Sequence, residues 1–84
     1  SPHNPYVYYG RGNLHAVSKD YVKAVADYTK AIELDPNFAE AYYNRGIANI
    51  NLKKTEEGIR DLSKAGELGL YNAYSIIKKY SNKK

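Results

Sequence analysis

The residues best suited to acid–base or metal chemistry are two histidines and one pair of adjacent glutamates. A histidine acts as a general base or binds a metal only beside further polar partners at a fitting spacing. His3 lies in a polar, proline-containing stretch, and no second histidine or cysteine stands at a ligand spacing from His15. Glu56 and Glu57 are neighbours, so on a helix their carboxylates point in different directions. This pattern predicts no catalytic centre and no metal site, and we expect His15 to pack between helices.

The run Gly10-Arg11-Gly12 is a further candidate, because glycine-rich loops bind phosphate through backbone amides. A phosphate loop follows a strand and carries a lysine next to a serine or threonine, and this run has neither feature. The chain also lacks cysteine, which excludes disulfides and thiolate metal sites. We therefore predict that the chain is not an enzyme and needs no cofactor, which leaves recognition as its chemistry.

The net charge of +4 comes largely from four lysines near the C-terminus. They are Lys78, Lys79, Lys83 and Lys84. A terminal run of charge usually serves solvation, so we predict no nucleic-acid partner, with weak anion binding by this tail as an alternative. No apolar run in the printed sequence reaches the length of a membrane span, and we expect no signal peptide within these 84 residues. We expect a soluble chain without a membrane span, and a cytoplasmic location is favoured.

A pattern with a period of 34 residues organises the chain. Tyr8, Tyr9, Arg11 and Gly12 return as Tyr42, Tyr43, Arg45 and Gly46. Likewise Asp27, Lys30, Ala31, Glu33 and Leu34 return as Asp61, Lys64, Ala65, Glu67 and Leu68. A fixed period of this length is typical of stacked helical repeats.

Apolar residues at helical spacing predict five helices and no strand. The first, third and fourth are expected at about residues 6–17, 39–52 and 55–68. Three helices follow a residue whose side chain can accept a backbone N–H, and the expected caps are Asp20, Asn37 or its neighbourhood, and Asn72. The pair Asp35-Pro36 ends the second helix, because proline lacks the amide that would continue it. Gly69 is expected to end the fourth helix in a backbone conformation that other residues resist.

On these residues the chain resembles the tetratricopeptide repeat family. The matching positions are Tyr8, Gly12, Tyr21, Ala24, Tyr28, Ala31 and Pro36 in the first repeat, and Tyr42, Gly46, Gly58, Leu62 and Ala65 in the second. The resemblance implies an all-α solenoid, in which two helix–turn–helix units and a capping helix form a right-handed stack. It divides a single domain, residues 1–84, into repeats at 5–38 and 39–70 and a capping helix at 72–80. The closing stretch is similar to the ends of bacterial members.

The sequence departs from the family pattern at four positions. His15 and Asn49 stand where the family has an aromatic residue, and Leu70 stands where it has proline. Gly58 stands where alanine is usual, so we expect Gly58→Ala to stabilise the fold by up to about 1 kcal/mol.

In the family, the first helices of successive repeats line a concave groove that holds a peptide or a partner helix. By helical phase, the resemblance implies a binding site made of Tyr9, Asn13, Tyr43, Asn44, Ile47 and Ile50. Tyr43, Ile47 and Ile50 form an apolar stripe, which either faces solvent as a binding surface or becomes core under the final helix. We predict a protein-interaction module. The alternative is a structural piece of a longer array, or one that pairs with another copy of itself.

One subgroup of the family grips the C-terminal carboxylate of heat-shock chaperones with two asparagines and three cations. Asn13 and Asn44 occupy the two asparagine positions. Tyr9 and Tyr74 replace two of the cations, and only Lys78 remains. We therefore expect the groove to prefer an apolar helix or extended segment to an acidic peptide.

Overall fold

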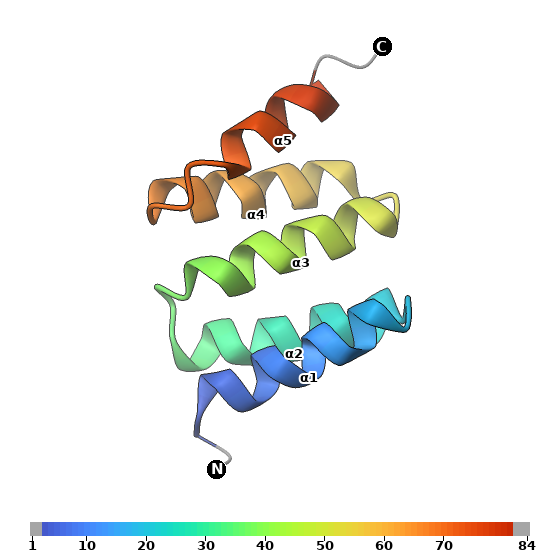
Figure 1. The fold of residues 1–84 in the computed structure, drawn as a ribbon, viewed down its shortest axis with the longest axis vertical. Coiled ribbons are helices and arrows are strands. Elements are labelled where there is room, and N and C mark those ends of the chain that lie inside the picture. Colours follow the sequence, from blue (N-terminus) through green and yellow to red (C-terminus); the bar gives the residue numbers. More distant parts are fainter. Residues whose placement is uncertain (1–2, 82–84) are drawn as a thin grey trace.

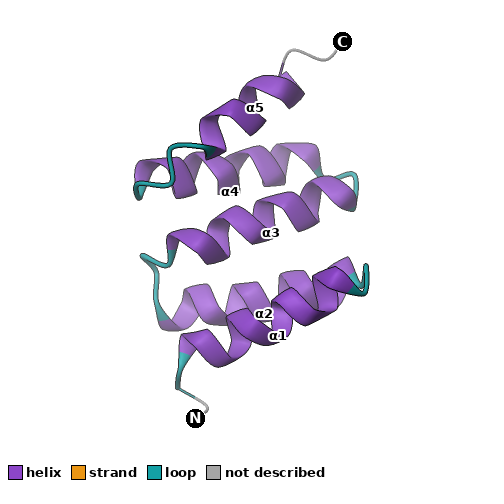
Figure 2. Cartoon of the chain, viewed as in Figure 1, coloured by secondary structure: helices purple, strands orange, loops and turns teal. Residues whose placement is uncertain are grey.

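The computed structural model describes residues 3–81, which form five helices stacked in chain order (Figure 1). They are α1 (Pro5–Val17), α2 (Tyr21–Leu34), α3 (Ala39–Asn51), α4 (Thr55–Glu67) and α5 (Ala73–Ser81). Loops join them, and none of the described residues lies in a strand (Figure 2). The all-α prediction is confirmed. None of these helices has the length and apolar character to cross a membrane, and the tail residues Lys83 and Lys84 lie outside the described part.

The core runs through the stack as three small clusters of buried side chains. Helix α1 packs on α2 and α3 on α4, while α2 also packs on α3 and so joins the two pairs. The clusters are Ala24, Tyr28 and Ala48; Ala31, Phe38 and Ala41; and Leu62, Ala65 and Ala73. Alanine dominates because small side chains let helices approach closely. Tyr28 and Leu62 are the largest fully buried side chains.

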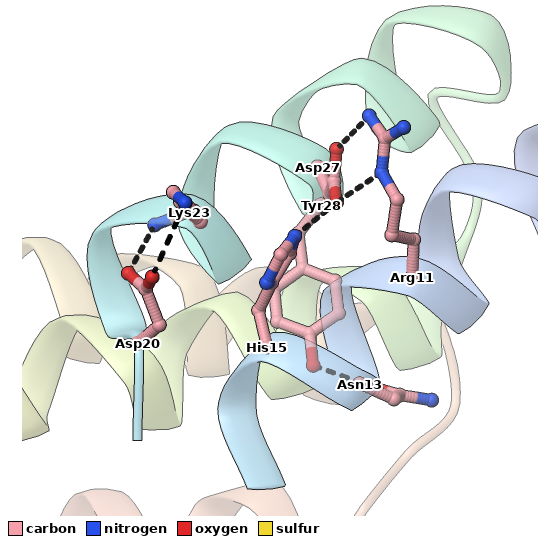
Figure 3. Close-up of polar contacts among 7 residues, drawn as sticks. All are labelled: Arg11, Asn13, His15, Asp20, Lys23, Asp27 and Tyr28. Atoms are coloured by element: carbon pink, nitrogen blue, oxygen red, sulfur yellow. Dashed lines mark hydrogen bonds and ion pairs between the residues drawn. The ribbon is translucent and has the colours of Figure 1, made fainter. Parts of the chain in front are cut away.

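The expected helix boundaries at Asp20, Asp35 and Gly69 are confirmed, and the cap expected at Asn37 or its neighbourhood falls on Phe38. Asp20 Oδ1 accepts the backbone N–H of Lys23 at 3.3 Å, as predicted (Figure 3). Gly69 has φ +111, the left-handed conformation expected of it. Asn37 does not cap α3, because Phe38 occupies the cap position and makes no side-chain bond there. Phe38 is buried in a core cluster, so packing decides where α3 begins.

The stabilisation expected of Gly58→Ala depends on room for a methyl group, and the structure does not provide that room. A Cβ at Gly58 would lie 2.7 Å from the carbonyl oxygen of Gly46 and 2.6 Å from Ile50 Cγ1. Both distances are shorter than carbon contacts allow. Helices α3 and α4 therefore meet backbone to backbone at this pair of glycines, and a methyl group has no room.

Helix α5 covers the open side of α4. Ala73 joins the cluster of Leu62 and Ala65, and Ile76 and Ile77 pack against it. Its first residue lies 34 positions after the first residue of α3, so α5 corresponds to the first helix of a further unit. Tyr80 stands where the repeat places Gly12 and Gly46. Tyrosine therefore replaces, in α5, the glycine at which a second helix approaches closely in each repeat.

Candidate peptide-binding groove

A hollow of ≈ 240 Å³ opens where α1, α2 and α3 meet. It is lined by Asn13, Ala16 and Val17 of α1, Tyr21 and Tyr28 of α2, and Asn44, Ile47 and Ala48 of α3. Three of the six residues predicted for the binding site, Asn13, Asn44 and Ile47, therefore share one concave surface.

A hydrogen-bond network forms the polar part of this hollow. The Tyr28 hydroxyl donates to Asn13 Oδ1 at 2.6 Å (Figure 3). Asn44 Nδ2 donates to the same oxygen at 3.0 Å and to the Tyr9 hydroxyl at 3.1 Å. Burial raises the pKa of Tyr28 to about 12, so its phenol stays protonated and remains a donor at neutral pH. A fourth predicted residue, Tyr9, is thus joined to the asparagine pair.

The asparagine pair keeps unused hydrogen-bonding capacity. An asparagine amide offers two donors on nitrogen and two lone pairs on oxygen. The hydrogen bonds of the network involve Asn13 Oδ1 and Asn44 Nδ2. Within residues 3–81, Asn13 Nδ2 and Asn44 Oδ1 have no hydrogen-bond partner. The hollow therefore presents one donor group, the amide nitrogen of Asn13, and one acceptor atom, the amide oxygen of Asn44. These match the C=O and N–H of a peptide backbone.

Tyr43 and Ile50 are not brought to the asparagine pair. Together with Ile47 they are half-buried and pack against the cluster of Leu62, Ala65 and Ala73, beside Ile76 and Ile77. Ile50 also lines a separate hollow of ≈ 380 Å³, with Asn51, Lys53, Thr55 and Tyr80. The apolar stripe of α3 is therefore partly covered and partly exposed, which lies between its two expected roles.

Tyr74, which stands at one of the expected cation positions, packs back onto α4. A Cβ at Gly66 would lie 2.8 Å from Tyr74 Cε2, so the ring covers this glycine. Lys78 is exposed on the outer side of α5.

Two family models, each described as tetratricopeptide repeat, match residues 5–38 and 27–60. The chain belongs to the tetratricopeptide repeat family. Domains of this family mediate protein–protein interactions, and this chain is such a module.

Several tetratricopeptide repeat proteins of eukaryotes are similar to this chain. Hsp70-Hsp90 organizing protein 3 of Arabidopsis thaliana is 42% identical over 60 residues, which cover 71% of this chain and 11% of that protein. The STIP1 homolog of Dictyostelium discoideum is 43% identical over 58 residues, 69% of this chain and 10% of that protein. The E3 ubiquitin-protein ligase CHIP of Arabidopsis thaliana is 35% identical over 69 residues, 82% of this chain and 25% of that protein.

The solved structure of the first TPR of Spaghetti (RPAP3), bound to the HSP90 peptide SRMEEVD, has the same fold. It matches with a TM-score of 0.91 and 29% identity, over 96% of this chain and 66% of that chain. The chain spans only 10% to 25% of the length of the three curated relatives. Because these relatives are eukaryotic, they give no support to the bacterial likeness expected from the closing stretch.

Each tetratricopeptide repeat also holds a two-bond ion pair that the sequence reasoning missed. Arg11 donates to both carboxylate oxygens of Asp27, at 2.9 and 2.8 Å (Figure 3). Arg45 donates to both oxygens of Asp61, at 2.9 and 2.7 Å. A third bond, from Arg45 Nη1 to Thr29 Oγ1 at 3.1 Å, ties the second repeat to the first. The hydrogen bonds from Arg11 lower the pKa of Asp27 below its ordinary value.

The signal for these pairs was present in the 34-residue period. The arginine and the aspartate both return, and they stand 16 residues apart in each repeat. Helical phase alone predicts that Asp27 lies on the charged outer face of α2, with Lys23 and Lys30, whereas it is 6% exposed.

The same carboxylates explain two departures from the tetratricopeptide pattern. His15 Nε2 lies 3.5 Å from Asp27 Oδ2 (Figure 3). At the equivalent position, Asn49 Nδ2 donates to Asp61 Oδ2 at 3.2 Å. A buried carboxylate needs polar partners for its remaining lone pairs. His15 and Asn49 thus serve packing between helices, and the described residues contain no group of three His, Cys, Asp or Glu arranged to hold a metal.

Proposed function

We propose that the chain binds an extended segment of a partner protein in the hollow between α1, α2 and α3. The observation that carries this proposal is the open donor of Asn13 and the open acceptor of Asn44 on one concave surface. The likeness to a tetratricopeptide repeat domain bound to a peptide supports it. Asn13 and Asn44 hold the segment's backbone, Tyr9 and Ile47 contact it beside them, and Tyr43 and Ile50 extend the surface along α3.

The ligand is proposed to be apolar rather than acidic. The peptide SRMEEVD carries three acidic side chains and a terminal carboxylate, which need cations in the groove. Arg11 and Arg45 are already paired with aspartates. Tyr9 and Tyr74 are neutral, so Lys78 is left as the cation of the family's carboxylate-binding set. Val17, Tyr21 and Ile47 instead give the hollow apolar walls.

The test is calorimetric titration of the chain with SRMEEVD and with the same peptide carrying alanine for both glutamates and leucine for the aspartate. We expect the substituted peptide to bind more tightly. Asn44→Ala should weaken that binding about tenfold, because a hydrogen bond of about 1–1.5 kcal/mol is lost. Asn37→Ala, an exposed loop variant away from the hollow, is the matched control. Tighter binding of SRMEEVD, or equal affinities of the two variants, would contradict the proposal.

We infer in addition that the chain has no catalytic role of its own. Within residues 3–81, the buried carboxylates Asp27 and Asp61 are committed to arginines, and His15 lies against one of them. A base or nucleophile needs a free partner facing a cleft. We also propose the division into repeats at 5–38 and 39–70 and a capping helix at 72–80, which the helix bounds support.

A further inference from the structure

Asn44 and Arg45, neighbours on α3, both reach from the second repeat to the first. Asn44 Nδ2 donates to Asn13 Oδ1 and to the Tyr9 hydroxyl, and both acceptors belong to α1. Arg45 Nη1 donates to Thr29 Oγ1 of α2 at 3.1 Å. Consecutive side chains of a helix point about 100° apart, so the two residues hold α3 against two different helices.

The guanidinium of Arg45 has a fixed orientation. Two of its nitrogens donate to the carboxylate of Asp61 on α4, at 2.9 and 2.7 Å, and Asp61 is 7% exposed. A pair with two parallel bonds of this kind fixes the plane of the guanidinium. The bond to Thr29 therefore connects two rigid elements, the pair of α3 and α4 on one side and α2 on the other.

The packing between α2 and α3 does little to fix the rotation of α3 about its axis. On α3 the buried contacts come from two alanines, Ala41 and Ala48, which pack in clusters with Ala31, Ala24 and Tyr28 of α2. Helices resist rotation where larger side chains of one fit between those of the other, and each alanine offers only a methyl group. Hydrogen bonds are directional, so they are the contacts that set this rotation.

A small rotation of α3 is enough to disturb the asparagine pair. The Asn44 amide lies about 6 Å from the axis of its helix, which is the outer radius of a helix with its side chains. A rotation of about 10° would move this amide by about 1 Å. The bond from Asn44 Nδ2 to Asn13 Oδ1 is 3.0 Å long, and a movement of that size away from α1 breaks it. The open acceptor of Asn44 then turns away from the open donor of Asn13.

We propose that Thr29 is a positioning residue for the peptide site. Thr29 fixes the rotation of α3 through Arg45, and this rotation sets the direction of the Asn44 amide. Thr29 does not itself line the hollow, so its effect on binding is indirect and rests on the proposed role of Asn44 in holding the partner's backbone.

The second repeat supplies a matched control at Ser63. Ser63 stands 34 residues after Thr29 and is half-buried on α4. Within residues 3–81 its side chain makes no hydrogen bond. The equivalent of Arg45 on α5 is Lys79, whose Nζ lies 5.7 Å from the centre of the Tyr80 ring. Ser63→Ala therefore removes a hydroxyl group without removing a bond between helices.

Calorimetric titration with the substituted peptide of SRMEEVD measures the effect, at a temperature where circular dichroism shows every variant folded. Thr29→Val removes the hydroxyl and keeps the branched shape. It should weaken binding about threefold to fivefold, because a hydrogen bond that orders a binding group is lost. Thr29→Ser keeps the hydroxyl, so Thr29→Ser and Ser63→Ala should both bind as the unaltered chain does. Unchanged affinity in Thr29→Val, or no recovery in Thr29→Ser, overturns the proposal.

A double-mutant cycle shows whether Thr29 acts through Asn44. Asn44→Ala removes the amide whose direction Thr29 is proposed to set. Adding Thr29→Val to Asn44→Ala should therefore change the affinity by less than about twofold. The same loss of affinity with and without Asn44 would mean that Thr29 acts on another part of the groove, and it overturns the proposal.

Nuclear magnetic resonance tests the positioning of Asn44 apart from the proposed function, because it needs no peptide. The side-chain amide resonances of Asn44 should shift in Thr29→Val and should not shift in Ser63→Ala. If they do not shift in Thr29→Val, the positioning role is refuted whatever peptide the chain binds. If they shift and neither peptide binds, the proposed function fails and the positioning of the Asn44 amide stands.

Discussion

Replacing Gly58 with alanine tests how closely α3 and α4 approach. Alanine gains about 1 kcal/mol in an unstrained helix interior. At Gly58 the added methyl group would lie 2.7 Å from the carbonyl oxygen of Gly46 and 2.6 Å from Ile50 Cγ1. Ile50 can turn aside, but a backbone oxygen moves only with its helix. Overpacking of this kind costs about 1–3 kcal/mol, so the net change should be a loss of up to about 2 kcal/mol.

Gly10→Ala is the matched control, because the same chemical change is made where nothing lies within 4 Å. It should stabilise the chain by up to about 1 kcal/mol, which places the two variants about 1–3 kcal/mol apart. In a domain of 84 residues, each kcal/mol moves the melting temperature by about 4–8 °C. Urea unfolding followed by far-ultraviolet circular dichroism measures the difference. If Gly58→Ala stabilises as much as Gly10→Ala, the close contact of the two helices is refuted.

Three further outcomes follow from buried groups. Tyr28→Ala should cost about 3 kcal/mol or more in urea unfolding, since Tyr28 is 1% exposed and packs in a core cluster. Burial raises the pKa of Tyr28 from 10.0 to about 12. Because the unfolded chain loses the phenol proton first, the free energy of unfolding should fall as pH rises from 10.0 toward 12. Tyr28→Phe should remove this contribution to the pH dependence of the free energy of unfolding. Asp61→Asn should cost about 1–3 kcal/mol, because the Arg45 side chain is 21% exposed and loses its charged partner. Asp27→Asn should cost less, since the Arg11 side chain is 61% exposed and can turn to water.

The helices could be predicted because their signals are local. The apolar stripe of α2, the cap at Asp20 and the left-handed glycine at position 69 depend on residues close in the chain. Gly58 was misjudged for the opposite reason. Whether its slot holds a methyl group depends on the separation of two helix axes, and no spacing pattern in one sequence reports that distance. The start of α3 was likewise decided by burial of Phe38 rather than by the capping ability of Asn37.

The candidate site was predictable in part for related reasons. Helical phase and family resemblance placed Asn13, Asn44 and Ile47 on one surface, and they line one hollow. Phase could not show that Tyr43 and Ile50 pack partly against the cluster of Leu62, Ala65 and Ala73, because that depends on the path of the chain after Gly69. Asp27 was assigned to the solvent side because a charged residue alone is usually exposed. Its burial depends on an arginine 16 residues away.

Tyr28 belongs both to the core and to the proposed groove, so packing of the core orients the polar groups of the proposed site. Tyr28 is held by packing on all sides of its ring and donates to Asn13. Asn13 in turn accepts from Asn44, which also donates to Tyr9. Packing of the first repeat therefore fixes the amide directions before any partner arrives, which lowers the ordering cost of binding. The apolar part of the surface lies on α3 toward α5, where Ile47, Tyr43 and Ile50 are braced by the last core cluster. A partner segment should accordingly place its backbone over the asparagines and its apolar side chains toward α5.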